Sequence, residues 1–151
     1  VTTLSNLLQN SLVLGKNEFI SMSEELQIVR SYLELEKIRF EERLEIVWDL
    51  DETLTDFQIP PFILQTQAEN AIKHGISKIV EGGKITVKTE QQGEHLVKIS
   101  IENTGKLGKN ADIGIGIENT VRRLDLQYGG KAKFDLSQKE NQVVCSIEIR
   151  R

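Results

Sequence analysis

The chain has little of what several common protein classes require. Cys145 is the only cysteine among 151 residues, so no intrachain disulfide can form, and one Cys with two His makes a zinc site unexpected. No apolar run reaches the roughly 18–20 residues that a membrane-spanning helix needs. The net charge of −4 argues against nucleic acid or an anionic membrane surface as the main partner.

Two common nucleotide-binding signatures are also missing. The sequence G-x-x-x-x-G-K-S/T does not occur, which argues against a P-loop protein. Gly114-Ile115-Gly116 lacks the third glycine and the directly preceding strand of a dinucleotide-binding motif. Cys145 falls in an alternating, strand-like run, which favours core packing over nucleophilic catalysis. The 38% of hydrophobic residues suffice for the core of one domain, with or without a helical extension.

Hydrophobic periodicity and chain breakers predict an ordered series of elements. Ser21 and Glu24 fit a capping box at the start of one helix. Pro60-Pro61 is expected to open another in its first turn, and Gly75 to end it. The predicted order is helix 2–14, helix 23–41, strand 44–50, helix 62–75, a hairpin turning at 91–93, loop 104–116, helix 118–128 and a final hairpin over 131–150. This order predicts an α+β two-layer sandwich with helices on one face of the sheet, not a doubly wound fold.

The helix predicted over residues 23–41 carries an unusually wide apolar surface. Its apolar residues form two adjoining stripes: Leu26, Val29, Leu33 and Phe40, and next to them Ile28, Tyr32 and Leu35. Such a surface favours contact with more than one neighbour, or a helix packed within a single fold. We expect a helical segment over 1–41 and a separate domain over 42–151.

The helix predicted over residues 62–75 carries most of the candidate chemistry. At 100° per residue, Ile63, Leu64, Ala68, Ala71 and Ile72 share one side, and Thr66, Glu69, Asn70, Lys73 and His74 share the other. An amide oxygen such as that of Asn70 is a suitable Mg²⁺ ligand, whereas Lys73 and His74 can contact phosphate oxygens. Glu69 can orient or deprotonate an attacking group, or bind an Mg²⁺ water. The spacing alone fits equally a solvated polar face with a Glu69–Lys73 pair.

The run Glu69-Asn70-Ala71-Ile72-Lys73-His74-Gly75, after a Pro-Pro-apolar lead, resembles the N box of the GHKL ATPase superfamily. More narrowly, it resembles that of LytS-like sensor histidine kinases. The stretch from Leu26 to Phe40 is similar to the segment that joins the phosphoacceptor region to the ATPase domain in that family. The resemblance covers essentially the whole chain. It implies a mixed, mostly antiparallel sheet, ATP and Mg²⁺ as cofactors, and Glu69 and Asn70 as catalytic residues.

Two glycine-containing segments extend the resemblance. Ile101-Glu102-Asn103-Thr104-Gly105 is similar to the G1 box, with Asn103 where relatives usually carry Asp; its side-chain oxygen can still accept a hydrogen bond from adenine. Glu102 is the alternative residue to contact adenine, and on a strand its side chain points to the opposite face from that of Asn103. Gly114-Ile115-Gly116-Ile117 is similar to the G2 box before a helix, with residues 106–113 as a short ATP lid. The resemblance implies ATP contacts from Asn70, Lys73, His74, Asn103, Gly105, Gly114, Gly116 and Ile117.

In that family the reaction passes the ATP γ-phosphoryl group to a histidine and then to an aspartate of a response regulator receiver domain. His74 belongs to the N box and His95 to a hairpin turn, so we expect the acceptor histidine upstream of Val1. The chain alone would then be unable to autophosphorylate. The resemblance also implies a homodimer in the intact protein, and a cytoplasmic domain of a protein anchored in the bacterial inner membrane.

Other functions of the same fold remain open from the sequence. An ATPase or a serine kinase is one, although the short lid and the Leu26–Phe40 segment argue against it. A degenerate nucleotide-binding or protein-interaction module without kinase activity is another, and the departure at Asn103 supports it. Arg122 and Arg123 stay open between a phosphate contact and a solvent-facing position.

Overall fold

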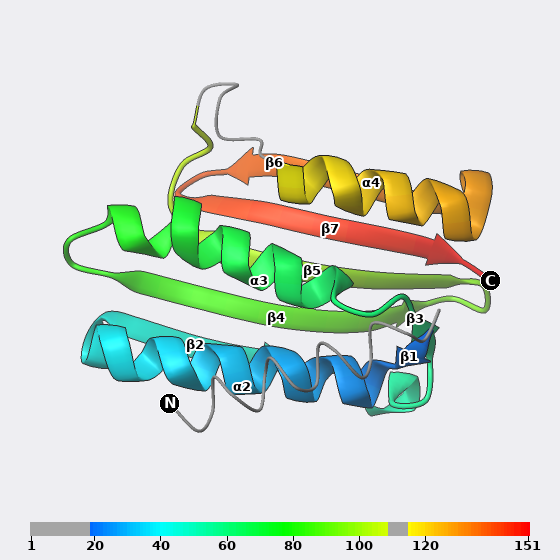
Figure 1. Cartoon of the computed structure of the whole chain (residues 1–151), viewed down its shortest axis with the longest axis horizontal. Helices are drawn as coiled ribbons and strands as arrows, with labels where there is room; N and C mark the ends of the chain where they lie inside the picture. Colours follow the sequence, from blue (N-terminus) through cyan, green and yellow to red (C-terminus); the bar gives the residue numbers. More distant parts are fainter. Residues whose placement is uncertain (1–18, 109–114) are drawn as a thin grey trace.

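The computed structural model describes residues 19–108 and 115–151, which form a layer of helices on a sheet (Figure 1). In chain order the main elements are β1 (Ile20–Ser21), α2 (Met22–Phe40), β2 (Leu44–Asp49), β3 (Gln58–Ile59), α3 (Ile63–His74), β4 (Gly83–Gln92), β5 (Leu96–Thr104), α4 (Ile115–Tyr128), β6 (Ala132–Lys139) and β7 (Gln142–Arg150). The helix predicted over 2–14 lies outside the described residues. The short strands β1 and β3 were not predicted, and the remaining elements were predicted with small differences in their bounds.

The main sheet is mixed and mostly antiparallel. Its strand order is β2-β4-β5-β7-β6; β2 runs parallel to β4, and the other three pairs are antiparallel. The two antiparallel hairpins come from short connections, whereas the chain between β2 and β4 crosses over through α3. A separate pair joins β1 to β3, in antiparallel register. The predicted fold class is confirmed.

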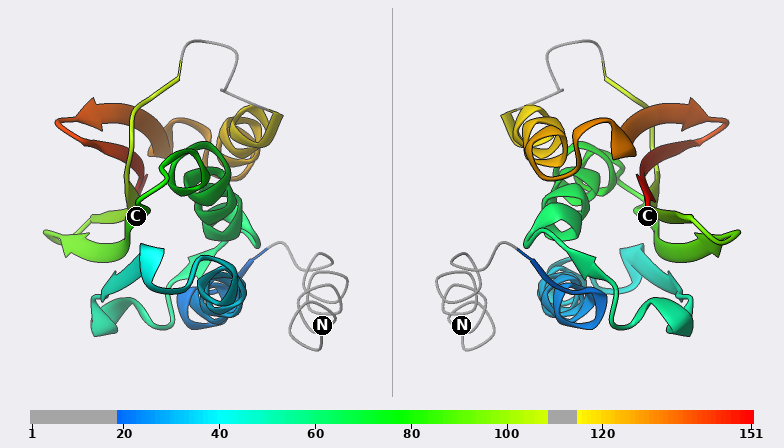
Figure 2. Two further views of the ribbon diagram at one scale, coloured as in Figure 1. Left: turned by 90° about the vertical axis from the view of Figure 1, so that its left-hand side faces the viewer. Right: turned by 90° about the vertical axis from the view of Figure 1, so that its right-hand side faces the viewer.

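The helices α2, α3 and α4 lie side by side on one face of the sheet, as the end-on views show (Figure 2). Strand residues alternate between a buried face under the helices and a polar outer face. The buried apolar residues of the three central strands are Ile85, Val87, Val97, Ile99, Ile101, Val143, Cys145, Ile147 and Ile149. On the outer face Lys88 of β4, Ser100 of β5, Ser146 of β7 and Asp135 of β6 lie in one cross-strand row. Ser100 and Ser146 are small and buried among their neighbours in this row, but the apolar side chains gather on the helix side, as expected of a two-layer sandwich.

Helix α2 begins where the sequence predicted. The Ser21 hydroxyl accepts a hydrogen bond from the backbone N–H of Glu24 at 3.1 Å, as an N-cap does. Val29 and Leu33 are fully buried in the core under the sheet, and Ile28 packs with Ile20 in a smaller second cluster. Helix α2 thus shares the core of the sheet. The predicted division of the chain after residue 41 stays a prediction.

Helix α3 begins differently from the prediction. It starts at Ile63, and the preceding Phe62 has a left-handed conformation with φ of 67° and no side-chain cap. Pro60-Pro61 therefore lies before the helix and not in its first turn, so that prediction was wrong. A buried carboxylate from another helix, Glu25 of α2, takes the place of a local cap.

Glu25 accepts three hydrogen bonds from the backbone where α3 begins. Its Oε1 accepts from Phe62 N at 2.8 Å, and its Oε2 accepts from Leu64 N at 2.8 Å and Gln65 N at 3.2 Å. Burial raises the pKa of the Glu25 carboxyl, and the three donors together with the charge of Arg123 oppose that rise. A carboxylate at a helix N-terminus satisfies free N–H groups and opposes the helix dipole. Glu25 thereby fixes α3 against α2.

Candidate functional site

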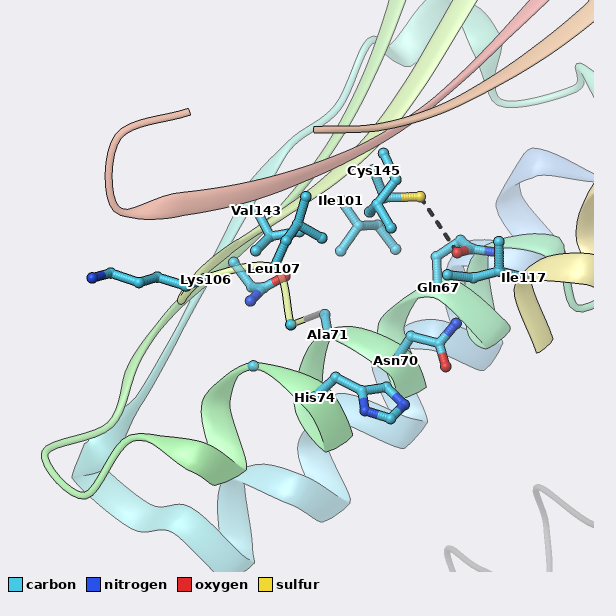
Figure 3. A pocket seen from close by; sticks show the side chains of 14 residues that line it. Gln67, Asn70, Ala71, His74, Ile101, Lys106, Leu107, Ile117, Val143 and Cys145 are labelled. Atoms are coloured by element: carbon cyan, nitrogen blue, oxygen red, sulfur yellow. Dashed lines mark hydrogen bonds between the residues drawn. The ribbon is translucent and has the colours of Figure 1, made fainter. Parts of the chain in front are cut away.

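A pocket opens between α3, the adjoining ends of β5 and β7, and the start of α4 (Figure 3). It holds about 580 Å³ of empty space, counting the part open to solvent. Its apolar lining comes from Ala71, Ile101, Leu107, Ile117, Leu136, Val143 and Cys145, and its polar lining from Gln67, Asn70, His74, Asn103 and Lys106. A largely apolar wall with a few polar groups suits a flat heterocycle that carries polar edges.

Only part of the polar side of α3 faces this pocket. Asn70 and His74 line it, whereas Glu69 and Lys73 are exposed on the outer surface of the helix. At 100° per residue, Glu69 and Lys73 lie roughly 60–100° round the helix from Asn70, which turns them toward solvent. Glu69 accepts a hydrogen bond from Gln65 Nε2 at 3.1 Å, and not from Lys73, the partner considered for a solvated polar face. Partial burial raises the pKa of the Glu69 carboxyl.

Asn103 lies on the buried face of β5, only 4% exposed, and lines the pocket, while Glu102 faces the other side of the sheet. Asn103 Nδ2 donates to Thr104 O at 3.0 Å, which leaves Oδ1 as the acceptor of the side chain. The backbone of Gly75 passes against this amide, and a Cβ at Gly75 would collide with Asn103 Nδ2 and with the Ala71 carbonyl. Gly75 thus ends α3, as predicted, and also makes room for Asn103.

The segment after β5 is held by a side chain that the sequence analysis did not single out. Gln138 of β6 accepts a hydrogen bond from Leu107 N at 2.7 Å and donates to Gly105 O at 3.1 Å. Gly105 lines a shallow hollow beside the pocket, and Leu107 lines the pocket itself. Lys106 extends away from the other labelled side chains (Figure 3). The backbone of residues 105–107 is therefore fixed at the rim of the pocket.

Helix α4 begins at Ile115, three residues before the predicted start. Gly116 and Ile117 are consequently in its first turn and not in the preceding loop. A Cβ at Gly116 would lie 3.2 Å from Thr66 Cγ2 and 3.6 Å from Asn70 Nδ2, so the absence of a side chain lets α4 approach α3. Ile117 lines the pocket. Gly114, the other predicted glycine contact, lies outside the described residues.

The two arginines of α4 have different surroundings. Arg122 is exposed, whereas Arg123 is partly buried and its charge interacts with that of Glu25. Burial lowers the pKa of the Arg123 guanidinium, and Glu25 opposes that change. Neither arginine lines the pocket.

Gln67 and Cys145 line the pocket but were not predicted as site residues. The Cys145 thiol donates to Gln67 Oε1, with sulfur and oxygen 3.4 Å apart (Figure 3). Burial raises the pKa of this thiol to about 12, so it stays protonated near neutral pH. The signal for Gln67 was present in the sequence, because a polar residue at position 67 interrupts the apolar side of α3.

The described residues offer one fitting position for a divalent cation. Asn70 Nδ2 is buried and has no hydrogen-bond partner among them. Rotating the Asn70 amide by a half-turn about its last side-chain bond exchanges Nδ2 and Oδ1, so that the oxygen takes the buried position. An amide oxygen is a suitable Mg²⁺ ligand. The described residues contain no group of three or more His, Cys, Asp or Glu side chains placed to hold a metal. Mg²⁺ commonly needs only one or two protein oxygens when phosphates and waters supply the rest, so Asn70 fits such an ion.

Comparison with known proteins identifies the family of the chain. A profile of the histidine kinase family matches residues 1–44. LytS, a sensor protein of Staphylococcus saprophyticus, is 34% identical over 95% of this chain and 27% of its own length. The catalytic domain of histidine kinase ThkA superposes with a TM-score of 0.68 at 18% identity, over 89% of this chain and 98% of that one. This chain belongs to the LytS-like sensor histidine kinases.

The fold of this LytS-like chain is that of histidine kinase catalytic domains. Histidine kinase ThkA in complex with the response regulator protein TrrA superposes over 99% of the chain and 47% of the kinase, with a TM-score of 0.63 at 19% identity. The LytS-like chain spans about a quarter of the length of the curated LytS that it matches. None of the helices in the described part of the chain combines the length and apolar character needed to cross a membrane.

Proposed function

We propose that this chain is the ATP-binding catalytic region of a two-component sensor histidine kinase. The observation that carries the proposal is the convergence of Asn70, His74, Asn103 and Ile117 on one mostly apolar pocket. These residues come from three elements that are far apart in the sequence. The apolar lining would take the base, and the phosphates would lie toward the first turn of α4, which contributes Ile117 to the pocket.

Asn103 is the residue proposed to recognise the base of the nucleotide. Its Nδ2 is committed to the Thr104 carbonyl, so Oδ1 is available to accept a hydrogen bond from an exocyclic amine. Adenine offers such an amine, whereas guanine presents a carbonyl oxygen at the equivalent place. We therefore expect adenine nucleotides to bind in preference to guanine nucleotides.

Asn70 would hold Mg²⁺ through its side-chain oxygen, and the bound ion would neutralise phosphate charge. His74 lies one turn further along α3 and lines the same pocket, where its imidazole can donate a hydrogen bond to a phosphate oxygen. Glu69 and Lys73 are proposed to act from the solvent side of α3. Such positioning and electrostatic stabilisation supply most of the catalysis in phosphoryl transfer.

Competition between nucleotides tests the base-binding part of this proposal. The dissociation constants of ATP and GTP are measured by calorimetry for the wild type and for Asn103→Ala. Loss of one hydrogen bond is expected to raise the ATP constant by about fivefold, and to remove the preference over GTP. Equal affinities for ATP and GTP in the wild type would contradict the assignment of Asn103.

The reaction proposed for the intact protein is transfer of the γ-phosphoryl group to a histidine and then to the receiver domain of a response regulator. The solved complex of ThkA with TrrA supports a partner of this kind. A homodimer and a cytoplasmic position for this region, with anchoring in the bacterial inner membrane, are parts of the same proposal. Incubation of the chain with γ-labelled ATP should leave His74 and His95 unlabelled, and stable label on either would contradict it.

A second candidate is a nucleotide-binding or interaction module without kinase activity. The neutral Asn103 in a position that usually carries Asp in relatives is the observation that favours it. The two functions differ in a phosphotransfer assay with the intact protein. Binding of Mg·ATP without any phosphohistidine would support the module.

A further inference from the structure

Three hydrogen bonds, two of them buried and the third partly buried, connect the floor of the pocket to the first turn of α4. The first is the bond from the Cys145 thiol to Gln67 Oε1. Gln67 Nε2 then donates to Thr120 Oγ1 at 2.9 Å, and Thr120 Oγ1 donates to Gly116 O at 2.8 Å. Gln67 and Thr120 are each 3% exposed, so water does not compete for these bonds. We call Gln67, Thr120 and Gly116 the α3–α4 relay.

The end of the relay lies beside the proposed phosphate side of the pocket. Gly116 packs against Asn70, with a distance of 3.6 Å between Asn70 Nδ2 and a Cβ placed on the glycine. Apolar residues at positions 67 and 120 would hold the two helices together without fixing the rotation of α4. One hydrogen bond, from Gln67 Nε2 to Thr120 Oγ1, joins the two helices, and the bond from Thr120 to Gly116 O lies within α4 and leaves the hydroxyl lone pairs to Gln67. Because this cross-helix bond is buried and directional, it favours one rotation of α4.

We propose that Gln67 and Thr120 are positioning residues, which orient the first turn of α4 for the phosphate groups of the bound nucleotide. Free backbone N–H groups at a helix N-terminus bind phosphate, and their direction depends on the rotation of the helix. The effect of the relay therefore concerns the phosphates and not the base, which lies against Asn103. This inference rests on the proposed binding of ATP.

Thr120→Val tests the relay, because valine keeps the shape of threonine and removes its hydroxyl. The dissociation constants of Mg·ATP and of adenosine are measured by calorimetric titration. The ATP constant is expected to rise about five- to thirtyfold, because a rotated α4 would weaken one or two hydrogen bonds from its first-turn N–H groups to phosphate. The adenosine constant should stay within about twofold of the wild type, since the contacts to the base are untouched. Thr86→Val, on the outer face of the sheet, is the matched control and should change neither constant.

A double variant separates positioning from stability. Thr120→Val alone leaves Gln67 without its partner and should lower the urea midpoint of unfolding. The double variant Gln67→Met with Thr120→Val replaces both buried partners by apolar groups of similar shape. Its urea midpoint should therefore return toward that of the wild type. The proposal requires that ATP affinity stays low in this variant, and that it falls by a larger factor than adenosine affinity, because Gln67 also lines the pocket. Recovery of ATP affinity together with stability would overturn it, and so would an equal loss of ATP and adenosine binding in Thr120→Val.

The same titrations distinguish this inference from the function on which it rests. A wild-type chain that does not bind Mg·ATP would overturn the proposed function and the inference together. A wild-type chain that binds Mg·ATP, with an unchanged ATP constant in Thr120→Val, would overturn the inference alone.

Discussion

Replacing Glu25 by glutamine should lower the stability of the whole chain, although Glu25 is far in sequence from the site. Its two oxygens accept three backbone N–H groups at the start of α3, from Phe62, Leu64 and Gln65. Glutamine has the same shape but only one acceptor oxygen, so its NH₂ group would face at least one backbone donor. That donor would be left buried and unpaired, and the negative charge at the helix N-terminus would be lost.

The magnitude follows from these two changes. A buried hydrogen bond to a charged group contributes about 1.5–3 kcal/mol, and a charge at a helix end about 0.3–2 kcal/mol. The relief of burying a charge offsets part of the loss, so the free energy of unfolding should fall by about 2–4 kcal/mol. Urea denaturation followed by circular dichroism measures it.

Glu24 provides the matched control for this prediction. Its side chain is exposed on the first turn of α2, and only its backbone N–H takes part in the Ser21 cap. Glu24→Gln should change the free energy of unfolding by less than about 0.5 kcal/mol, as surface substitutions usually do. A Glu25→Gln variant as stable as Glu24→Gln would refute the role of Glu25 as the cap of α3.

Three further results are expected from other parts of the structure. Gly75→Ala should lower stability by about 1–3 kcal/mol and weaken ATP binding, because the new methyl group collides with the Asn103 amide; unchanged unfolding and titration curves would contradict this. The Thr53 hydroxyl, followed by backbone N–H donors, lowers the pKa of Asp51 below its ordinary value. The stabilisation by Asp51 is therefore present above that ordinary value, near pH 4, and is lost as the pH falls through the lower folded-state pKa. Asp51→Asn should reduce the loss of stability between pH 4 and pH 2 (roughly) in urea titrations, and an unchanged pH profile would contradict it. Cys145, with its thiol pKa raised to about 12 by burial, should react slowly with iodoacetamide at neutral pH and rapidly in denaturant; equal rates would contradict its buried position.

The sequence predicted the fold well because hydrophobic periodicity reflects burial directly. The alternating run around Cys145 predicted core packing for that residue, which is 8% exposed, and Gly75 was correctly predicted as the end of α3. The start of α3 was predicted wrongly for a physical reason. A proline pair is a local signal, whereas the actual cap is Glu25, which lies 37 residues before Phe62 and acts only in the folded protein.

The candidate site was predictable as a set of residues but not as an arrangement. The N box predicted Asn70 and His74, but the sequence analysis grouped Glu69 and Lys73 with them on one side of the helix, whereas the structure exposes both to solvent. The hydrogen bonds of Gln67 were also inaccessible, because its partners belong to β7 and α4. Long-range contacts of this kind depend on tertiary packing, which no local pattern encodes.

Titration of Mg·ATP into the wild type and into Asn70→Ala tests the central claim most directly. Asn70 contributes a side-chain amide beside Gly116, and its Nδ2 has no partner among the described residues. The account predicts that the wild type binds ATP more tightly with Mg²⁺ than with EDTA. It also predicts that Asn70→Ala loses that Mg²⁺ dependence and at least about tenfold in affinity, with its unfolding midpoint little changed. Equal affinity of the two proteins for Mg·ATP, or no binding by the wild type, would contradict it.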